Sequence, residues 1–356
     1  MQHAYVAVEG GPVIEARGRV PGTAQGELVF TTAYTGYEES LTDPSYRGQV
    51  LTFAYPLIGN YGVREDRFES DAVQPAAVIA RELTDEVVEW LSSAGVPAVD
   101  QLDTRDLVVD IRESGAKRCG IAIGPDVTPD DARAQLETCP TMSERHDIGD
   151  LVSVSEPARF GPSDGEPTVA LIDCGVKRSI INSLVERGAS VHVLPHDTDG
   201  ATVKALDADL LFISNGPGDP QTYTEAAELV ASFAGDLPIA GICLGQQIVA
   251  LGLGGSTEKM RFGHRGVNQP VQDLHTGQVI MTSQNHGYTV DEHPELSVTQ
   301  INVNDDTIEG LESDELDIIT RQYHPEAHPG PLDSLGFFDD VISKAVEQRR
   351  PLAAAD

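Results

Sequence analysis

The chain has 356 residues, enough for two ordinary domains. It carries 24 Lys and Arg against 57 Asp and Glu, a formal net charge of −33 at pH 7. This balance argues against nucleic acid or an anionic membrane surface as a partner, because both bind through clustered cations.

The acidic residues are spread over both halves of the chain rather than gathered in a tail, and few of the cations are lysine. We interpret this as an adaptation to a salt-rich cytoplasm, since high salt screens the self-repulsion of an acidic surface. The four cysteines are too widely spaced for a disulfide scaffold or a CxxC metal site. No signal peptide or membrane span is visible, so we expect a cytoplasmic protein.

The first half, residues 1–154, is predicted to form a mixed α/β domain. Short β-like runs and amphipathic helical patterns alternate there with turn residues. The expected strands are Leu28–Thr32, Gln49–Tyr55 and Ala77–Ala80, and the expected helices are Thr84–Ala94 and Arg105–Ser114. A stretch rich in Pro, Gly and Ser, residues 155–167, is predicted to be a linker.

In the second half, residues 168–350, strand and helix patterns alternate regularly. Such alternation predicts a doubly wound, mostly parallel sheet with helices on both faces. The expected elements are strands Thr168–Asp173, Ser190–Leu194, Leu210–Ser214 and Pro238–Ile242, and helices Lys177–Arg187 and Tyr223–Ala234. From about residue 257 we expect a mixed or antiparallel extension. Ligands bind at the carboxyl ends of the strands in such sheets, so that edge is where a site is expected.

Cys243 follows the fourth of these strands in the run Gly241-Ile242-Cys243-Leu244-Gly245, which precedes an apolar helix at Ile248–Leu253. The run has the shape of a G-x-S-x-G nucleophile elbow with cysteine in place of serine. Such a turn projects the thiol from the sheet and sets it at a helix N-terminus, where the dipole favours a thiolate. A lone buried cysteine is usually structural, but the glycine bracket favours a nucleophile.

A cysteine nucleophile needs a histidine and an acceptor that orients it. Among ten histidines, His324 lies in Tyr323-His324-Pro325-Glu326, where an extended backbone places His324 and Glu326 on one side. One alternative is a metal site formed by His324, Glu326 and His328, although the prolines exclude the helical H-x-x-x-H geometry. Another is a surface turn with no role, which the presence of Cys243 disfavours.

Two further loops carry polar or glycine-rich runs. Asn215-Gly216-Pro217-Gly218-Asp219 follows the third strand, and its glycines suit either an oxyanion hole or a tight connection. Ser283-Gln284-Asn285-His286-Gly287-Tyr288 contains groups that suit a small polar substrate. We find no P-loop and no placed G-x-G-x-x-G, so the sequence indicates no nucleotide site.

Together, NGPGDP, GICLGQQ and HPEA make residues 168–350 resemble a class I glutamine amidotransferase. The resemblance is closest to the small-subunit family of glutamine-dependent carbamoyl-phosphate synthase. Two segments of the first half support this family, because other amidotransferases lack them. They are TGYEESLTDPSY at Thr35–Tyr46 and YPLIGNYG at Tyr55–Gly62. KMRFGHRG at Lys259–Gly266 and SQNHGY at Ser283–Tyr288 also resemble this family.

The resemblance implies that Cys243 is the nucleophile, that His324 moves the protons and that Glu326 orients His324. It implies that the glycines of NGPGDP and the Leu244 amide form the oxyanion hole. Glutamine-binding positions would be Ser45, Gly216, Gly218, Leu244, Gln247, Asn285, Gly287 and Tyr288. Gln246 and Tyr288 depart from the residues common in the family, His and Phe, and neither belongs to the triad.

The resemblance further implies a large carbamoyl-phosphate synthase subunit as partner, in a heterodimer or a higher assembly. That subunit would use ATP and Mg, with bicarbonate, to make carbamoyl phosphate for arginine and pyrimidine biosynthesis. L-glutamine would be the substrate of this chain, which is expected to hold no cofactor or metal. The alternatives are an amidotransferase for another synthetase, such as anthranilate or GMP synthesis, and a catalytically silent regulatory subunit.

Overall fold

A computed structural model describes residues 2–348, and the chain forms two compact units. The first comprises the residues up to His146 together with Arg261–Gly266; the second comprises Asp147–Met260 and the residues from Val267 onward. This division falls before the stretch 155–167 that we expected to be a linker. Ile148 is already fully buried against Gly218 of the second unit, and β10 (Ala158–Phe160) pairs with β12 (Ser190–Pro195).

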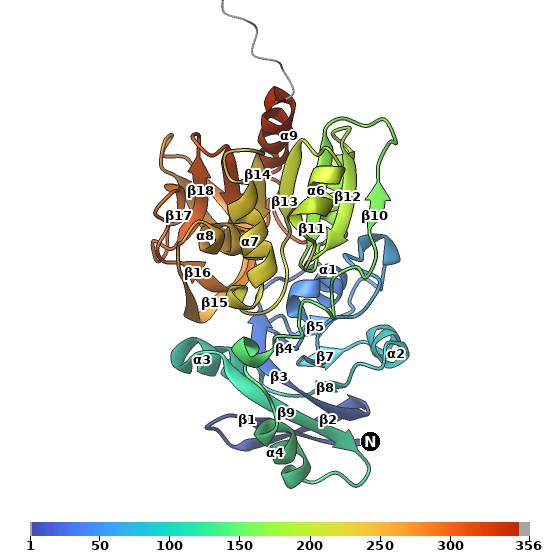
Figure 1. Cartoon of the computed structure of the whole chain (residues 1–356). Helices are drawn as coiled ribbons and strands as arrows, with labels where there is room; N and C mark the ends of the chain where they lie inside the picture. Colours follow the sequence, from blue (N-terminus) through green and yellow to red (C-terminus); the bar gives the residue numbers. More distant parts are fainter. Residues whose placement is uncertain (1, 349–356) are drawn as a thin grey trace, which may run out of the picture. The chain divides into compact units, whose positions relative to one another are not determined.

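The first unit is built on a closed barrel with strand order β1-β2-β8-β6-β4-β3-β9 (Figure 1). Its strands are β1 (Gln2–Val8), β2 (Val13–Val20), β3 (Gly22–Thr31), β4 (Gln49–Phe53), β6 (Ala77–Ile79), β8 (Ala98–Asp100) and β9 (Lys117–Gly124), and β5 (Leu57–Ile58) pairs separately with β7 (Glu82–Leu83). Its helices are α1 (Tyr37–Thr42), α2 (Asp85–Ser93), α3 (Thr104–Ser114) and α4 (Pro129–Glu137). The strands and helices expected in this half are confirmed; their ends agree to within two residues, except that β3 begins at Gly22, six residues before the expected Leu28.

Side chains alternate across the barrel strands, as the period of a strand requires. On β3, Leu28 and Phe30 pack in a cluster that also holds Leu107 and Ile111 of α3. Val29, between them, packs in a second cluster with residues of α1 and α2. The barrel wall therefore carries buried apolar side chains on both faces.

The second unit contains a ten-stranded sheet, in the order β10-β12-β11-β13-β14-β19-β18-β17-β15-β16. The remaining strands are β11 (Thr168–Asp173), β13 (Leu210–Ile213), β14 (Ile239–Ile242), β15 (Thr257–Asp273), β16 (Val279–Val290), β17 (Ser297–Asn302), β18 (Ile308–Ser313) and β19 (Ile318–Arg321). Pairing is parallel from β12 to β19, while β17 and β18 pair antiparallel with their neighbours, so the expected sheet and its extension are confirmed.

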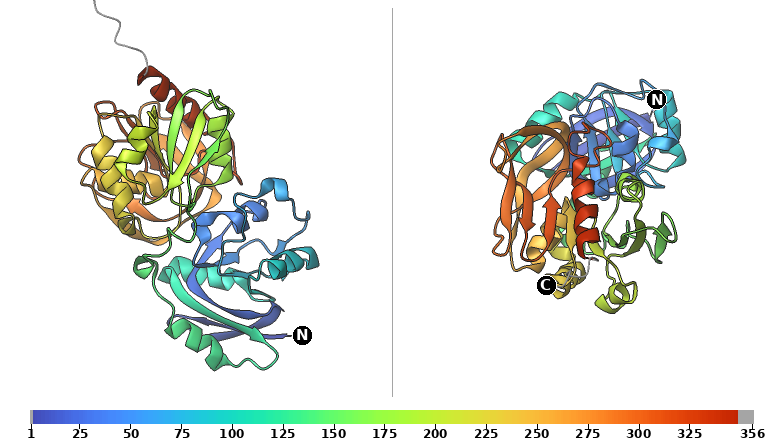
Figure 2. Two further views of the ribbon diagram at one scale, coloured as in Figure 1. Left: turned by 45° about the vertical axis from the view of Figure 1, so that its right-hand side comes forward. Right: turned by 90° about the horizontal axis from the view of Figure 1, so that it is seen from above.

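Helices cover both faces of the parallel part of this sheet (Figures 1 and 2). They are α5 (Arg178–Val185), α6 (Gly200–Ala205), α7 (Thr224–Phe233), α8 (Leu244–Gly252) and α9 (Gly336–Gln348). Residues of α5 and α9 share one apolar cluster with the strands, and α7 and α8 lie side by side in front of β13 and β14 in Figure 1. The strand ends that carry the predicted motifs are thereby held between packed layers.

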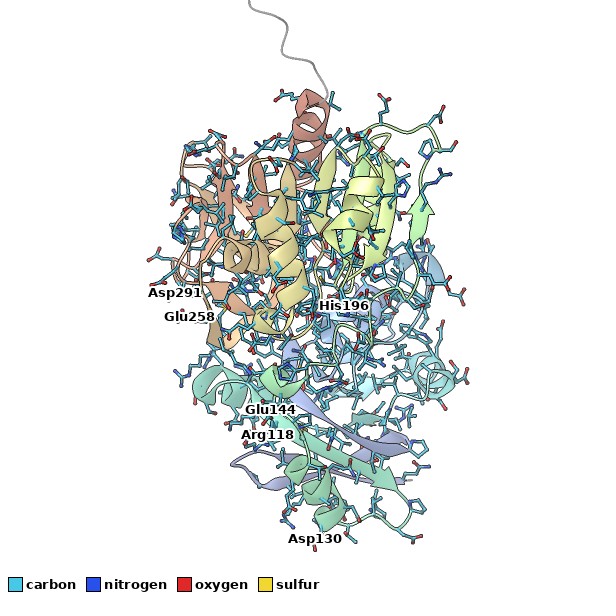
Figure 3. All side chains as sticks on the ribbon, in the orientation of Figure 1. Arg118, Asp130, Glu144, His196, Glu258 and Asp291 are labelled. Carbon is cyan, nitrogen blue, oxygen red and sulfur yellow. The ribbon has the colours of Figure 1, made fainter. Side chains whose placement is uncertain are left out.

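Acidic side chains stand on the surface of both units. Asp130 and Glu144 of the first unit and Glu258 and Asp291 of the second are all exposed (Figure 3). No helix within residues 2–348 is long and apolar enough to cross a bilayer.

Candidate active site

Cys243 occupies a strained turn between β14 and α8. Its backbone has φ 56° and ψ −106°, a conformation that a non-glycine residue rarely adopts. The turn is held on one side by the Cys243 N–H, which donates to the Arg321 carbonyl at 2.8 Å, and on the other by the start of α8 at Leu244. Strain of this kind is characteristic of functional sites, where surrounding structure maintains it.

The two glycines that bracket Cys243 are required by the packing of the turn. A Cβ on Gly245 would lie 2.1 Å from the Ile213 carbonyl oxygen, and one on Gly241 would lie 2.8 Å from the Gly245 carbonyl carbon. Both distances are shorter than any real contact of a Cβ. The helix begins at Leu244, four residues before the expected Ile248, and the polar Gln246 and Gln247 are buried within its first turn.

His324 and Glu326 form a direct contact, as predicted. His324 Nδ1 lies 2.6 Å from Glu326 Oε1, and both side chains are buried. The local backbone is not the extended segment that we expected: His324 makes a single bridge to Ser283, and a turn begins at Pro325. The turn still brings the two side chains together, and it leaves His324 Nε2 buried without a hydrogen-bond partner among the described residues.

Lys177 is a member of this cluster that the sequence analysis missed. Its ammonium donates to Glu326 Oε1 at 2.9 Å and to the carbonyls of Ala327 and His328 at 2.8 and 2.9 Å. Its place after β11, at the same sheet edge as Cys243, was the signal available in the sequence. Because a cation occupies the Glu326 carboxylate, the alternative metal site of His324, Glu326 and His328 is disfavoured.

The charges of this cluster shift one another's pKa values strongly. Burial alone would lower the pKa of His324, but its interactions with the Glu326 carboxylate and with Cys243 raise it to about 10. Burial alone would raise the pKa of Glu326, but Lys177 and protonated His324 lower it to about 2. Near neutral pH the site therefore holds an imidazolium on an ionised carboxylate, beside the cysteine.

The loop after β13 lies against the cysteine turn. A Cβ on Gly216 would be 1.9 Å from the Cys174 carbonyl oxygen and 2.9 Å from Leu244 Cδ2, so only glycine fits there. Gly218 has φ +97°, in the region that favours glycine. The Leu244 N–H belongs to the first turn of α8, where backbone donors have no partner inside the helix. The free N–H of Leu244 beside the glycine loop at Gly216 is an arrangement suited to binding an oxyanion.

Strand β16 brings the predicted Asn285, Gly287 and Tyr288 to the same place. The Cys243 thiol lies 3.8 Å from the Asn285 carbonyl, and the His324 N–H donates to the Ser283 carbonyl at 2.8 Å. Gln247 Nε2 donates to the Tyr288 carbonyl and to Gln322, so its amide nitrogen braces β16 against α8. The second unit thus gathers all the predicted site residues except Ser45.

Ser45 belongs to the first unit, in a short 3-10 turn at Pro44–Tyr46. The Ser45 N–H donates to the Asp43 carboxylate at 2.9 Å. The two segments that carried the family resemblance in this half contact each other, because the Tyr61 hydroxyl donates to Glu38 at 2.9 Å and accepts from the Gly36 N–H at 2.6 Å. The role of Ser45 in binding glutamine stays a prediction.

Comparison with known proteins gives family matches in both halves. Residues 170–344 match the model of glutamine amidotransferase class-I, and residues 6–121 match that of the carbamoyl-phosphate synthase small chain, CPSase domain. The carbamoyl phosphate synthase small chain of Halobacterium salinarum is 63% identical over 99% of this chain and 100% of its own length. That of Archaeoglobus fulgidus is 44% identical over 97% of this chain and 99% of its own. The Halobacterium relative fits the interpretation of the acidic surface as halophilic.

Proposed function

Because the chain belongs to the carbamoyl phosphate synthase small-chain family, we propose that it is the glutamine-hydrolysing subunit of such a synthase, with Cys243, His324 and Glu326 as its catalytic triad. The observation that carries the proposal is the buried His324–Glu326 contact beside a cysteine held at φ 56° on a nucleophile elbow. The enzyme as a whole is a ligase, and this chain contributes its glutaminase reaction.

In the first half of the reaction, Cys243 Sγ attacks the side-chain amide carbon of glutamine. The developing oxyanion is placed against Gly216 and the Leu244 N–H at the start of α8. His324 then donates a proton to the amide nitrogen as the C–N bond breaks, which releases ammonia and leaves a glutamyl thioester on Cys243. Glu326 and Lys177 act on His324 by holding its ring and its charge in place.

In the second half, His324 has lost its proton and acts as the general base toward water. The hydroxide so formed attacks the thioester carbonyl, the C–S bond breaks, and glutamate leaves. The side chains or backbone of Ser45, Gly218, Gln247, Asn285, Gly287 and Tyr288 are proposed to hold the substrate. The sulfur is restored as the thiolate beside an imidazolium.

Ammonia is useful to a synthase only before it is protonated, since ammonium is not a nucleophile. Hydrolysis is therefore best coupled to an acceptor shielded from water. We infer that a large subunit holding ATP and Mg receives the ammonia and makes carbamoyl phosphate from bicarbonate, for arginine and pyrimidine biosynthesis. The two chains would form a heterodimer or a higher assembly.

The test is the variant Cys243→Ser in the assembled complex with its large subunit. We expect glutamine-dependent carbamoyl phosphate synthesis to disappear while synthesis from added ammonia continues at the wild-type rate. A variant that keeps full glutaminase activity would contradict the assignment of the nucleophile. A wild-type complex that hydrolyses no glutamine would identify the chain as a silent regulatory subunit.

A further inference from the structure

Gln322 is a fully buried glutamine of the second unit that directly follows β19. The carbonyl of the preceding Arg321 accepts from the Cys243 N–H at 2.8 Å, and His324 lies two residues further along the chain. The Gln322 N–H donates to the Glu309 carbonyl of β18 at 2.9 Å, which fixes its main chain. Its side chain takes no part in the reaction proposed above, so the buried amide needs another explanation.

Two hydrogen bonds fix the orientation of the Gln247 amide. Gln247 Nε2 lies 2.8 Å from the Tyr288 carbonyl oxygen and 3.0 Å from Gln322 Oε1. A backbone carbonyl can only accept, so the nitrogen of Gln247, and not its oxygen, has to face Tyr288. Both hydrogens of that nitrogen are then used, and within residues 2–348 the Gln247 side-chain oxygen has no hydrogen-bond partner. Gln247 can therefore offer a substrate only an acceptor.

The orientation of the Gln322 amide follows from that of Gln247. Because Gln322 receives an N–H from Gln247, it has to present its oxygen, and its own Nε2 is left buried without a hydrogen-bond partner among the described residues. A buried donor without a partner costs free energy, which an apolar side chain of similar shape would not cost. Local choices that cost stability are typical of functional sites. The contribution of this amide is therefore the contact that its oxygen makes with Gln247.

The three segments joined by this contact carry the proposed substrate-binding and catalytic residues. Gln247 belongs to α8, which begins directly after Cys243, and Tyr288 belongs to β16. Gln322 belongs to the segment that leads from β19 to His324. One amide nitrogen thus ties the three segments together. The oxygen that it leaves free suits the ammonium group of an amino acid, which can only donate, and would repel its carboxylate.

We infer that Gln322 is a positioning residue for glutamine binding, which holds the Gln247 amide so that its oxygen accepts from the ammonium group of the substrate. The inference rests on the proposed function, which supplies the substrate. Without the Gln322 oxygen, the Gln247 amide is held by the Tyr288 carbonyl alone and can turn away from the substrate. Cys243 and His324 keep their places, because main-chain hydrogen bonds hold them.

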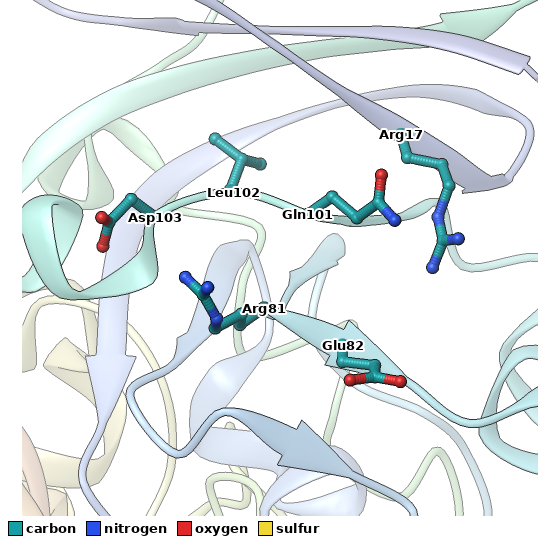
Figure 4. Close-up of a pocket in the computed structure, with 6 residues that line it drawn as sticks. All are labelled: Arg17, Arg81, Glu82, Gln101, Leu102 and Asp103. Atoms are coloured by element: carbon teal, nitrogen blue, oxygen red, sulfur yellow. The ribbon is translucent and has the colours of Figure 1, made fainter.

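The experiment measures kcat and KM for glutamine hydrolysis by the full-length chain, by Gln322→Met and by two control variants. Gln246→Met removes a neighbouring buried amide of α8, whose oxygen accepts from the Thr320 hydroxyl at 3.1 Å and whose nitrogen also has no partner among the described residues. Gln101→Met replaces a glutamine in the wall of a polar pocket of the first unit (Figure 4). We expect KM to rise about tenfold in Gln322→Met with kcat within about twofold of the wild type, as the loss of uniform binding requires. Both controls should keep the wild-type KM.

Three further measurements separate positioning from a structural role. In a Gln247→Leu chain, Gln322→Met should raise KM no further, because Gln322 acts through Gln247. Competition by glutaramate, which is glutamine without its α-amino group, should be the same for the wild type and for Gln322→Met. The unfolding temperature of Gln322→Met should also match the wild type, since the change removes one buried donor without a partner and leaves another on Gln247.

The inference would be overturned by an unchanged KM in Gln322→Met, or by a rise in KM that persists in the Gln247→Leu chain. Weaker competition by glutaramate would remove the ammonium group from the explanation. A lowered unfolding temperature would assign the amide to the fold instead. A wild-type chain that hydrolyses no glutamine would contradict the proposed function itself, which keeps the two failures distinct.

Discussion

In each unit of the molecule a carboxylate is buried between cations, and the two clusters differ in the kind of cation that holds it. Asp100 in the first unit is fully buried and held by Arg17, Arg19 and the Leu83 N–H. Glu326 in the second unit is equally buried and held by Lys177 and His324. Burial raises the pKa of both carboxyls, and in both the cations outweigh it and lower the pKa.

The difference lies in what the cations can do. The arginines around Asp100 do not lose their protons in the working range of a protein, so that cluster can only hold the chain together. His324 can exchange a proton, and it stands next to a cysteine on a strained turn. A buried charge cluster therefore indicates chemistry only where one member titrates beside a group that can react.

The largest loss of activity is expected from replacing His324, the member of the Glu326 cluster that can exchange a proton. His324→Asn keeps a polar side chain but leaves no group that can carry the proton to and from the substrate. We expect kcat for glutamine hydrolysis to fall by at least about 10³-fold. Ammonia-dependent synthesis by the complex is the control and should stay unchanged; a variant with near-normal glutaminase activity would remove His324 from the mechanism.

Glu326→Gln should have the next largest effect and should change the pH dependence. We expect kcat/KM to fall by about 10²-fold, because the ring loses its charged partner. In the wild type, interactions with Glu326 and Cys243 raise the pKa of His324 to about 10, so the proton proposed for the leaving nitrogen is lost only as the pH rises through that value. Without the Glu326 charge this pKa falls, and the alkaline limb of the profile should move to lower pH. An alkaline limb at the wild-type position would contradict the assignment.

Asp100→Asn is the matched substitution in the other cluster, and it should change stability instead of chemistry. Removing one partner of a buried charge cluster typically costs about 3–5 kcal/mol. The lowered pKa of Asp100 means that its stabilisation is present above the unfolded pKa and is lost as the pH falls through the folded pKa. The variant should lack this part of the acid dependence in denaturant titrations, while kcat for glutamine hydrolysis stays close to the wild type. A large loss of kcat with normal stability would contradict the interpretation of Asp100 as a residue that only stabilises the fold.

The smallest effect is expected at the contact between the two family-specific segments of the first unit. Tyr61→Phe removes the hydroxyl that binds Glu38 and the Gly36 N–H, and it should lower the free energy of unfolding by about 1–2 kcal/mol. Tyr34→Phe is the control, since that side chain is 64% exposed. Equal stability of the two variants in urea would show that the contact contributes nothing.

The sequence predicted the second unit well because its signals are local. Alternating apolar runs located β11, β13 and β14, and the glycines around Cys243 marked the turn that the packing requires. Lys177 was not predicted as part of the site, because nothing near it in the sequence shows that its ammonium binds Glu326, which lies far along the chain. The barrel was not predicted for the same reason. The parallel pairing of β3 with β4 and of β4 with β6 depends on contacts between segments that are far apart in the sequence.

The proposed mechanism requires a covalent glutamyl intermediate on Cys243. The direct measurement is to mix the wild-type chain with isotopically labelled glutamine, quench in acid within one turnover, and map the label by mass spectrometry. If the mechanism is right, the peptide that contains Cys243 carries a glutamyl thioester. The label should be absent from Cys243→Ser, and it should accumulate in a variant that hydrolyses the thioester more slowly. Glutamine turnover with no label on that peptide, or with label on another residue, would contradict it.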